Sequence, residues 1–206
     1  ATPQDVHDAW NNGARLLRYQ ILPGLLIQPE HWDAHISAVI QHLDTVVFPN
    51  IGPAKVILDM HSAPGGMRGR KLRIFSDPVC MQAFWAGWYR LIQHVDAYPP
   101  VLGYGVINEP AGSAKEVSQL HRDFLNRSIT SKVVTITAPR CTPGNFSDTP
   151  FFGTQHLYEV HVYEPLSLTH QGLPGRKKGK KYPSSSFNKS SLIRAMRPML
   201  KFQQKY

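Results

Sequence analysis

The sequence has few cysteines and no long apolar run. Cys80 and Cys141 are too few for a disulfide scaffold and lack metal-ligand spacing, and whether they form a single bridge stays open. No stretch approaches the roughly eighteen consecutive apolar residues of a membrane helix, so we expect no membrane span. Residues 1–10 hold no basic segment followed by an apolar core, so we expect no signal peptide within this chain.

Acidic residues are absent from the last fifth of the chain. Residues 165–206 contain 10 basic and no acidic side chains, whereas residues 1–164 contain 13 basic and 14 acidic ones, so the net charge of +9 arises in the tail. Five of these cations, between Arg176 and Lys181, lie among glycine, proline and serine, which is typical of a solvated loop. A patch that binds polyanions is the less favoured interpretation, and we expect no nucleic-acid partner.

Length and composition indicate one globular domain spanning residues 1–206. The chain is 42% hydrophobic, 10% aromatic and 18% charged, which is the balance of a soluble folded domain rather than a disordered one. It is long enough to bury a sizeable core, yet it is shorter than most (β/α)8 barrels.

Short apolar runs alternate with longer amphipathic stretches, the pattern of parallel strands joined by crossover helices. The five predicted strands are nearly continuous in apolar residues, as expected when both faces of a sheet are covered. They span residues 14–22, 55–61, 101–108, 132–138 and 157–163. Helices are predicted over residues 31–48, 78–95 and 190–204, the last kinked by Pro198, and a further one begins at a capping box of Ser113 and Glu116.

Polar residues follow the ends of three predicted strands. His61, Asn108 with Glu109, and His161 with Tyr163 all come directly after apolar runs. Because the carboxyl ends of parallel strands meet at one edge of a sheet or barrel, we expect these side chains to lie together.

Glu109 is the strongest candidate for proton transfer. It follows an apolar strand, stands beside Asn108, and precedes Pro110, which disfavours a helical backbone at Glu109. A carboxylic acid in a half-buried cleft has its pKa raised by desolvation, as a proton donor to a leaving group requires. We therefore predict a raised pKa for Glu109, and a sugar-binding role for Asn108.

Four segments together resemble glycoside hydrolase family 5, the family of many cellulases. Gly13-Ala14-Arg15-Leu16-Leu17-Arg18 is similar to the second barrel strand, and Ile57 to Gly66, with His61, is similar to the third. Asn108-Glu109-Pro110 resembles the end of the fourth strand. His161-Val162-Tyr163-Glu164-Pro165, followed by Thr169-His170-Gln171-Gly172, resembles the sixth.

The resemblance implies a (β/α)8 barrel that hydrolyses a β-linked polysaccharide or oligosaccharide with retention, without metal or cofactor. It implies Glu109 as the acid/base and Arg18, His61, Asn108, His161 and Tyr163 as substrate-binding residues. A secreted or periplasmic location is expected from the family.

The resemblance ends after the sixth barrel strand, so we expect an incomplete barrel of about five to six of the eight β/α units. The family's nucleophile Glu, at the end of the seventh strand, has no counterpart before Tyr206, and Glu164 is a weak substitute. An open barrel leaves unpaired strand edges. We expect a homodimer, symmetric or swapped, or rearranged chain ends to cover them.

Three functions follow as hypotheses. The first is a retaining endo-β-1,4-glucanase, and the second is a nearly inactive remnant that binds glucan. The third is a hydrolase of another bond, such as an ester, in which Glu109 activates water and His61 or Asn108 stabilises the oxyanion. No Gly-x-Ser-x-Gly turn supports a serine nucleophile.

Overall fold

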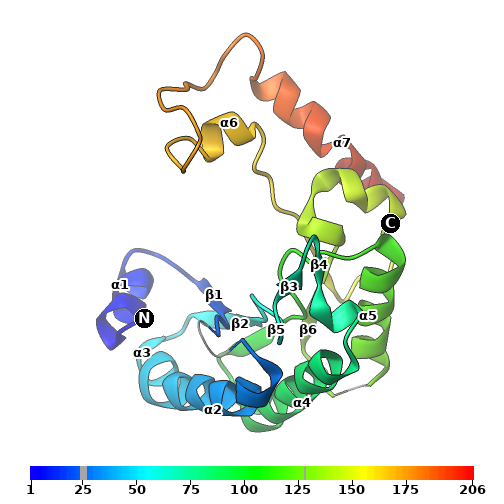
Figure 1. Ribbon diagram of the computed structural model, residues 1–206. Helices are drawn as coiled ribbons and strands as arrows, with labels where there is room; N and C mark the ends of the chain where they lie inside the picture. Colours follow the sequence, from blue (N-terminus) through cyan, green and yellow to red (C-terminus); the bar gives the residue numbers. More distant parts are fainter. Residues whose placement is uncertain (24–26, 128) are drawn as a thin grey trace.

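A computed structural model describes residues 1–23, 27–127 and 129–206 as an α/β fold built on a parallel sheet (Figure 1). The sheet has five strands in the order β1-β2-β5-β6-β7, all parallel. The strands are β1 Leu16–Gln20, β2 Lys55–Asp59, β5 Val101–Gly105, β6 Val133–Thr137 and β7 Leu157–Glu159, and a separate antiparallel pair is formed by β3 Met67–Arg68 and β4 Lys71–Leu72.

Helices connect β1 to β2, β2 to β5 and β5 to β6, while α1 precedes the sheet and α7 follows it. The longer ones are α1 Pro3–Asn11, α2 Trp32–His42, α4 Pro78–Val95, α5 Ala114–Asn126 and α7 Lys189–Lys205. The shorter turns are η2 Pro29–His31, the π-helical η3 Leu43–Val47, α3 Phe48–Asn50, η4 Arg73–Phe75, η5 Pro139–Cys141, η6 Pro143–Asp148 and α6 Leu166–Thr169. None of the described helices is long and apolar enough to cross a membrane.

The five predicted strands are confirmed, and each ends earlier than the apolar pattern suggested. The helix predicted over residues 78–95 is confirmed at both bounds, and Asp77 caps it by accepting hydrogen bonds from the first amides. The capping box of Ser113 and Glu116 is also confirmed, with both reciprocal hydrogen bonds formed. α7 runs through Pro198 as one helix.

Helix α1 and the β3–β4 pair are among the elements that were not predicted. α1 begins at a capping box of Thr2 and Asp5 with Pro3 in its first turn, a signal that the sequence does contain. The β3–β4 pair is too short to show an alternating pattern. The two cysteines are both buried and free, so the bridge left open by the sequence does not form.

The core lies between the sheet and the helices that cover it, α2, α4 and α5 (Figure 1). Trp88 of α4 is fully buried, meets Tyr104 and Phe124 edge to face, and donates its indole N–H to the carbonyl of Val106 at 3.2 Å. Aromatic contacts of this kind stabilise a core beyond their buried area. They hold β5, and therefore the residues that follow it, in a fixed position.

The outer strands β1 and β7 leave the two edges of the sheet open. Within the described residues no further strand pairs with either one. Leu16 of β1 is 48% exposed and Leu157 of β7 is 45% exposed, so apolar side chains accompany the unpaired backbone groups. Open, apolar edges favour association with another strand.

We therefore expect the purified chain to associate through these edges. Light scattering should give twice the chain mass of 23.2 kDa, and Leu157→Lys should shift the protein towards the monomer because it places a charge on the β7 edge. The matched control is Leu173→Lys, since Leu173 is comparably exposed, at 51%, but lies away from the sheet. A strictly monomeric wild-type chain would rule out the dimer.

Candidate active site

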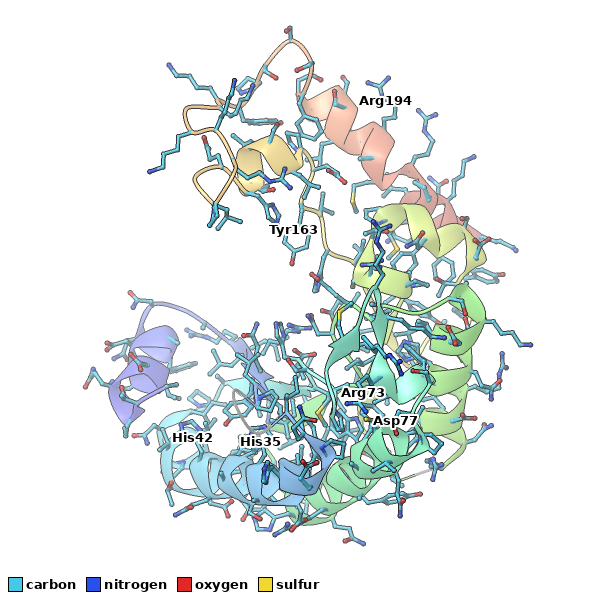
Figure 2. The ribbon with its side chains drawn as sticks, in the orientation of Figure 1. His35, His42, Arg73, Asp77, Tyr163 and Arg194 are labelled. Carbon is cyan, nitrogen blue, oxygen red and sulfur yellow. The ribbon has the colours of Figure 1, made fainter. Side chains whose placement is uncertain are left out.

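The carboxyl ends of β1, β2, β5 and β7 bring the predicted site residues together. Arg18 lies in β1, His61 follows β2, Asn108 and Glu109 follow β5, and His161 and Tyr163 follow β7. The parallel order of the strands produces this convergence, because every strand in the sheet ends on the same side. The segment carrying Tyr163 leads from β7 towards α6 (Figure 2).

Arg18 is the link between these strand ends. Its Nη2 lies 2.9 Å from Asn108 Oδ1, to which it donates a hydrogen bond, and 2.9 Å from the carboxylates of Asp59 and Glu159. Glu159 was missed as a site residue by the sequence reasoning. Its signal was the alternation of a strand, in which residues two apart face the same side, so Glu159 accompanies His161.

Asp59 is buried beneath the site and orders two of its members. Its side chain is 1% exposed, contacts Arg18, and accepts a hydrogen bond of 2.8 Å from His61 Nδ1. Burial raises the pKa of Asp59, while the Arg18 charge and the His61 hydrogen bond act in the opposite direction. This position suits a residue that orients neighbours rather than one that meets substrate.

Glu109 is held by two donors from the segment that follows the edge strand β7. Its Oε1 accepts hydrogen bonds from the Tyr163 hydroxyl at 2.5 Å and from His161 Nδ1 at 2.7 Å. The Glu109 backbone has a φ of 40°, in the left-handed region, and Pro110 disfavours the ordinary helical alternative. Such a conformation costs about 1–3 kcal/mol and is found most often at functional sites.

The predicted direction of the Glu109 pKa shift was wrong. Burial does raise the pKa, but the hydrogen bonds from Tyr163 and His161 and the charges of His161 and His61 together outweigh it, so the pKa lies below its ordinary value. In return, the hydrogen bond to Glu109, followed by burial, raises the pKa of Tyr163 to about 12. Glu109 is therefore ionised and Tyr163 protonated at neutral pH.

His161 stands between two carboxylates. Its Nδ1 is 2.7 Å from Glu109 Oε1 and its Nε2 is 2.7 Å from Glu159 Oε1. A neutral imidazole carries one N–H, so two hydrogen bonds to ionised carboxylates need a second proton, on the ring or on one carboxyl. The ring also fills the space between Glu109 and Glu159, which keeps these two acids from flanking a substrate bond.

Cys141, Glu159 and His161 are the described residues whose ligand atoms come close enough to hold a metal, within 4.8 Å of one another. Two features oppose a cation there. Arg18 already contacts Glu159 Oε1, and burial, with the neighbouring Glu159 charge, raises the pKa of the Cys141 thiol strongly. The arrangement is that of a hydrogen-bonded charge network.

Comparison with known proteins places the fold. No family model and no curated protein matches the sequence of this chain. Among solved structures, Thermotoga maritima Cel5A in complex with mannotriose matches with a TM-score of 0.75 at 16% identity, over 100% of this chain and 68% of that one. Pseudomonas stutzeri endoglucanase Cel5A in complex with cellobiose matches with a TM-score of 0.67 at 21% identity, over 98% and 61%.

A glycoside hydrolase family 5 subfamily 4 broad-specificity endoglucanase from Clostridium longisporum also matches, with a TM-score of 0.65 at 15% identity, over 100% of this chain and 63% of that one. The chain has the fold of the family 5 endoglucanases. At these identities the likeness is one of fold, and the chain spans about two thirds of the barrels it matches. The predicted incomplete (β/α)8 architecture is confirmed.

Tyr163→Phe tests the hydrogen-bond network around Glu109. Removing the hydroxyl deletes a donor that stabilises the ionised carboxylate, so the pKa of Glu109 should rise. The titration of the Glu109 carboxyl, followed by carbon NMR, measures the shift. Tyr182→Phe, at an exposed tyrosine outside the site, is the control, and an unchanged or lower Glu109 pKa in Tyr163→Phe would contradict the assignment.

Proposed function

We propose that this protein is a glycoside hydrolase of the endo-β-1,4-glucanase type, acting on a β-linked polysaccharide with Glu109 as its acid/base. The observation that carries the proposal is the environment of Glu109. One oxygen is held by Tyr163 and His161, while within the described residues Oε2 accepts no hydrogen bond. The side chain is 34% exposed, so Oε2 is open to a glycosidic oxygen or a water.

The remaining site residues suit the binding of a sugar. Arg18, His61 and Asn108 gather at the same strand ends, and together with His161 and Tyr163 they would orient the substrate against Glu109. The fold supports this proposal, because the similar structures include enzymes solved with cellobiose and with mannotriose. We propose that the protein acts where such polymers occur, outside the cytoplasm.

In the proposed first step, the protonated Glu109 donates its proton to the glycosidic oxygen as the bond from the anomeric carbon to that oxygen breaks. A second carboxylate bonds to the anomeric carbon in the same step. In the second step, the Glu109 carboxylate takes a proton from the water that displaces this second carboxylate from the anomeric carbon. Retention also needs a second carboxylate about 5–5.5 Å away. Glu159 is tied to Arg18 and His161, so that carboxylate has to come from outside the described cluster.

A second function, glucan binding with little or no hydrolysis, is favoured by the position of His161. The imidazole occupies the space between Glu109 and Glu159, and Glu109 is ionised at neutral pH rather than protonated. Binding through Arg18, Asn108 and the exposed edge of Tyr163 needs neither a proton donor nor a nucleophile.

Release of reducing sugar from carboxymethyl cellulose tests hydrolysis. We expect Glu109→Gln to lower the rate by at least about 100-fold, the scale of a general acid/base contribution. Glu30→Gln should leave the rate unchanged, since Glu30 is an exposed acid in η2, away from the site residues. Equal rates in wild type and Glu109→Gln would exclude Glu109, and binding without any release would support the second function.

The rate should also depend on pH in a defined direction. The first step needs protonated Glu109, and the pKa of that carboxyl lies below its ordinary value of 4.5. The rate is therefore expected to rise as the pH falls towards this pKa for as long as the protein stays folded. A rate that rises with pH from 4 to 7 would assign the first step to another acid.

A further inference from the structure

Helix α7 presents a row of cations that the site does not use. Arg194, Arg197, Lys201 and Lys205 are spaced three, four and four residues apart, and all four are exposed. At 3.6 residues per turn they lie on one face of the helix, along about 16 Å of its length. Arg194 lies on the outer side of α7 in Figure 2.

This cationic face borders a cavity of about 410 Å³ between α7 and η6. All four cations line it, together with the hydroxyl groups of Ser147 and Thr149. Phe146 and Phe202 close its floor, where their rings meet edge to face. The cavity therefore combines an apolar floor, hydroxyl groups on one wall and positive charge on the other.

The charge of this face is not balanced within the described chain. None of the four cations forms an ion pair there, and Asp148, the acid of η6, forms none either. Like charges three and four residues apart on a helix repel one another. A ligand that carries several negative charges in a row would relieve this repulsion and release counterions.

We propose that the α7 cationic face and η6 form a second binding site, for a polysaccharide that bears carboxylate groups. The polysaccharide nature of the ligand rests on the proposed function, whereas its negative charge rests on the α7 cationic face alone. Arginine and lysine pair with successive carboxylates, while Ser147 and Thr149 meet sugar hydroxyls. The site would hold an acidic polymer apart from Glu109.

The aromatic residues that line the cavity favour an acidic polysaccharide over a single-stranded nucleic acid as its ligand. Nucleic acids without sequence preference bind by stacking their bases on exposed aromatic rings beside a basic groove. Phe146 is fully buried and Phe202 is 9% exposed, so their rings offer no open face for stacking. Tyr206 also lines the cavity and is 50% exposed, but its ring already stacks on Phe151, with ring centroids 4.6 Å apart. One ring that is already stacked is fewer than successive bases need, so charge and polar contacts dominate the accessible wall.

Two polymers with the same β-1,4-glucan backbone test the proposal: carboxymethyl cellulose, which is anionic, and hydroxyethyl cellulose, which is neutral. Binding of each to the immobilised 206-residue chain is measured at low and at moderate salt. The wild type should prefer carboxymethyl cellulose, and the combined Arg194→Gln, Arg197→Gln, Lys201→Gln and Lys205→Gln variant should lose about tenfold or more of that affinity. Its binding of hydroxyethyl cellulose should not change.

The control variant removes the same charge elsewhere. It combines Lys177→Gln, Lys178→Gln, Lys180→Gln and Lys181→Gln, at four positions in the exposed loop before α7. This variant should lose less than about threefold of the affinity for carboxymethyl cellulose, because only long-range attraction is weakened. Ser147→Asp is a second test that leaves α7 intact, and it should also weaken carboxymethyl cellulose binding. Circular dichroism confirms that each variant is folded.

Three results would overturn the proposal. They are equal losses in the α7 and loop variants, equal wild-type affinity for the two polymers, and tighter binding of a single-stranded DNA oligonucleotide than of carboxymethyl cellulose. Failure of the proposed hydrolysis is distinguishable from these results. A chain that releases no sugar but binds carboxymethyl cellulose through α7 keeps the second site.

Discussion

The site depends on one guanidinium group. Nη2 of Arg18 reaches the ends of three other strands through Asp59, Asn108 and Glu159, and the last two of these neighbour Glu109 and His161. Asp59 is almost fully buried, so its charge is stabilised mainly by this contact and by His61. Removing one partner of a buried ion pair typically costs about 3–5 kcal/mol, because the remaining charge is left uncompensated.

The same network determines the protonation of Glu109. A half-buried carboxyl is expected to favour its neutral form, yet Tyr163 and His161 both donate to one oxygen of Glu109 and stabilise the anion. Substrate entering the site would compete for these donors. The proposed first step needs protonated Glu109, and this form would become favourable only as the hydrogen bonds to Oε1 weaken. Substrate binding would therefore promote the protonation of Glu109.

The sheet and the C-terminal helix α7 differ in the interactions that hold them in place. Helices α2, α4 and α5 bury a continuous aromatic and aliphatic core against the strands, whereas α7 contacts η6 mainly through Phe202 and keeps its cations exposed. The open edges at β1 and β7 and the α7 cationic face are therefore the surfaces where this chain can gain contacts. All three surfaces are exposed in a chain that spans about two thirds of the barrels it resembles.

The sequence by itself determined the strands of the sheet and most of the site's membership. Apolar runs bounded by polar residues located the five strands, and Ser113 with Glu116 located the start of α5. The residues after the strands identified His61, Asn108, Glu109, His161 and Tyr163 as neighbours, whereas Arg18 came from the family resemblance. These are local patterns, and the rule that parallel strands end on one side needs no coordinates.

Only the tertiary structure decided the protonation of Glu109 and which side chains of the site pair with one another. The donors that lower the Glu109 pKa lie 52 and 54 residues away in the chain, so burial could be foreseen but its compensation could not. Glu159 joined the site because Arg18, from the far edge of the sheet, reaches it. Hydrogen bonds and ion pairs depend on distances of a few tenths of an ångström between distant segments, which no pattern along the chain encodes.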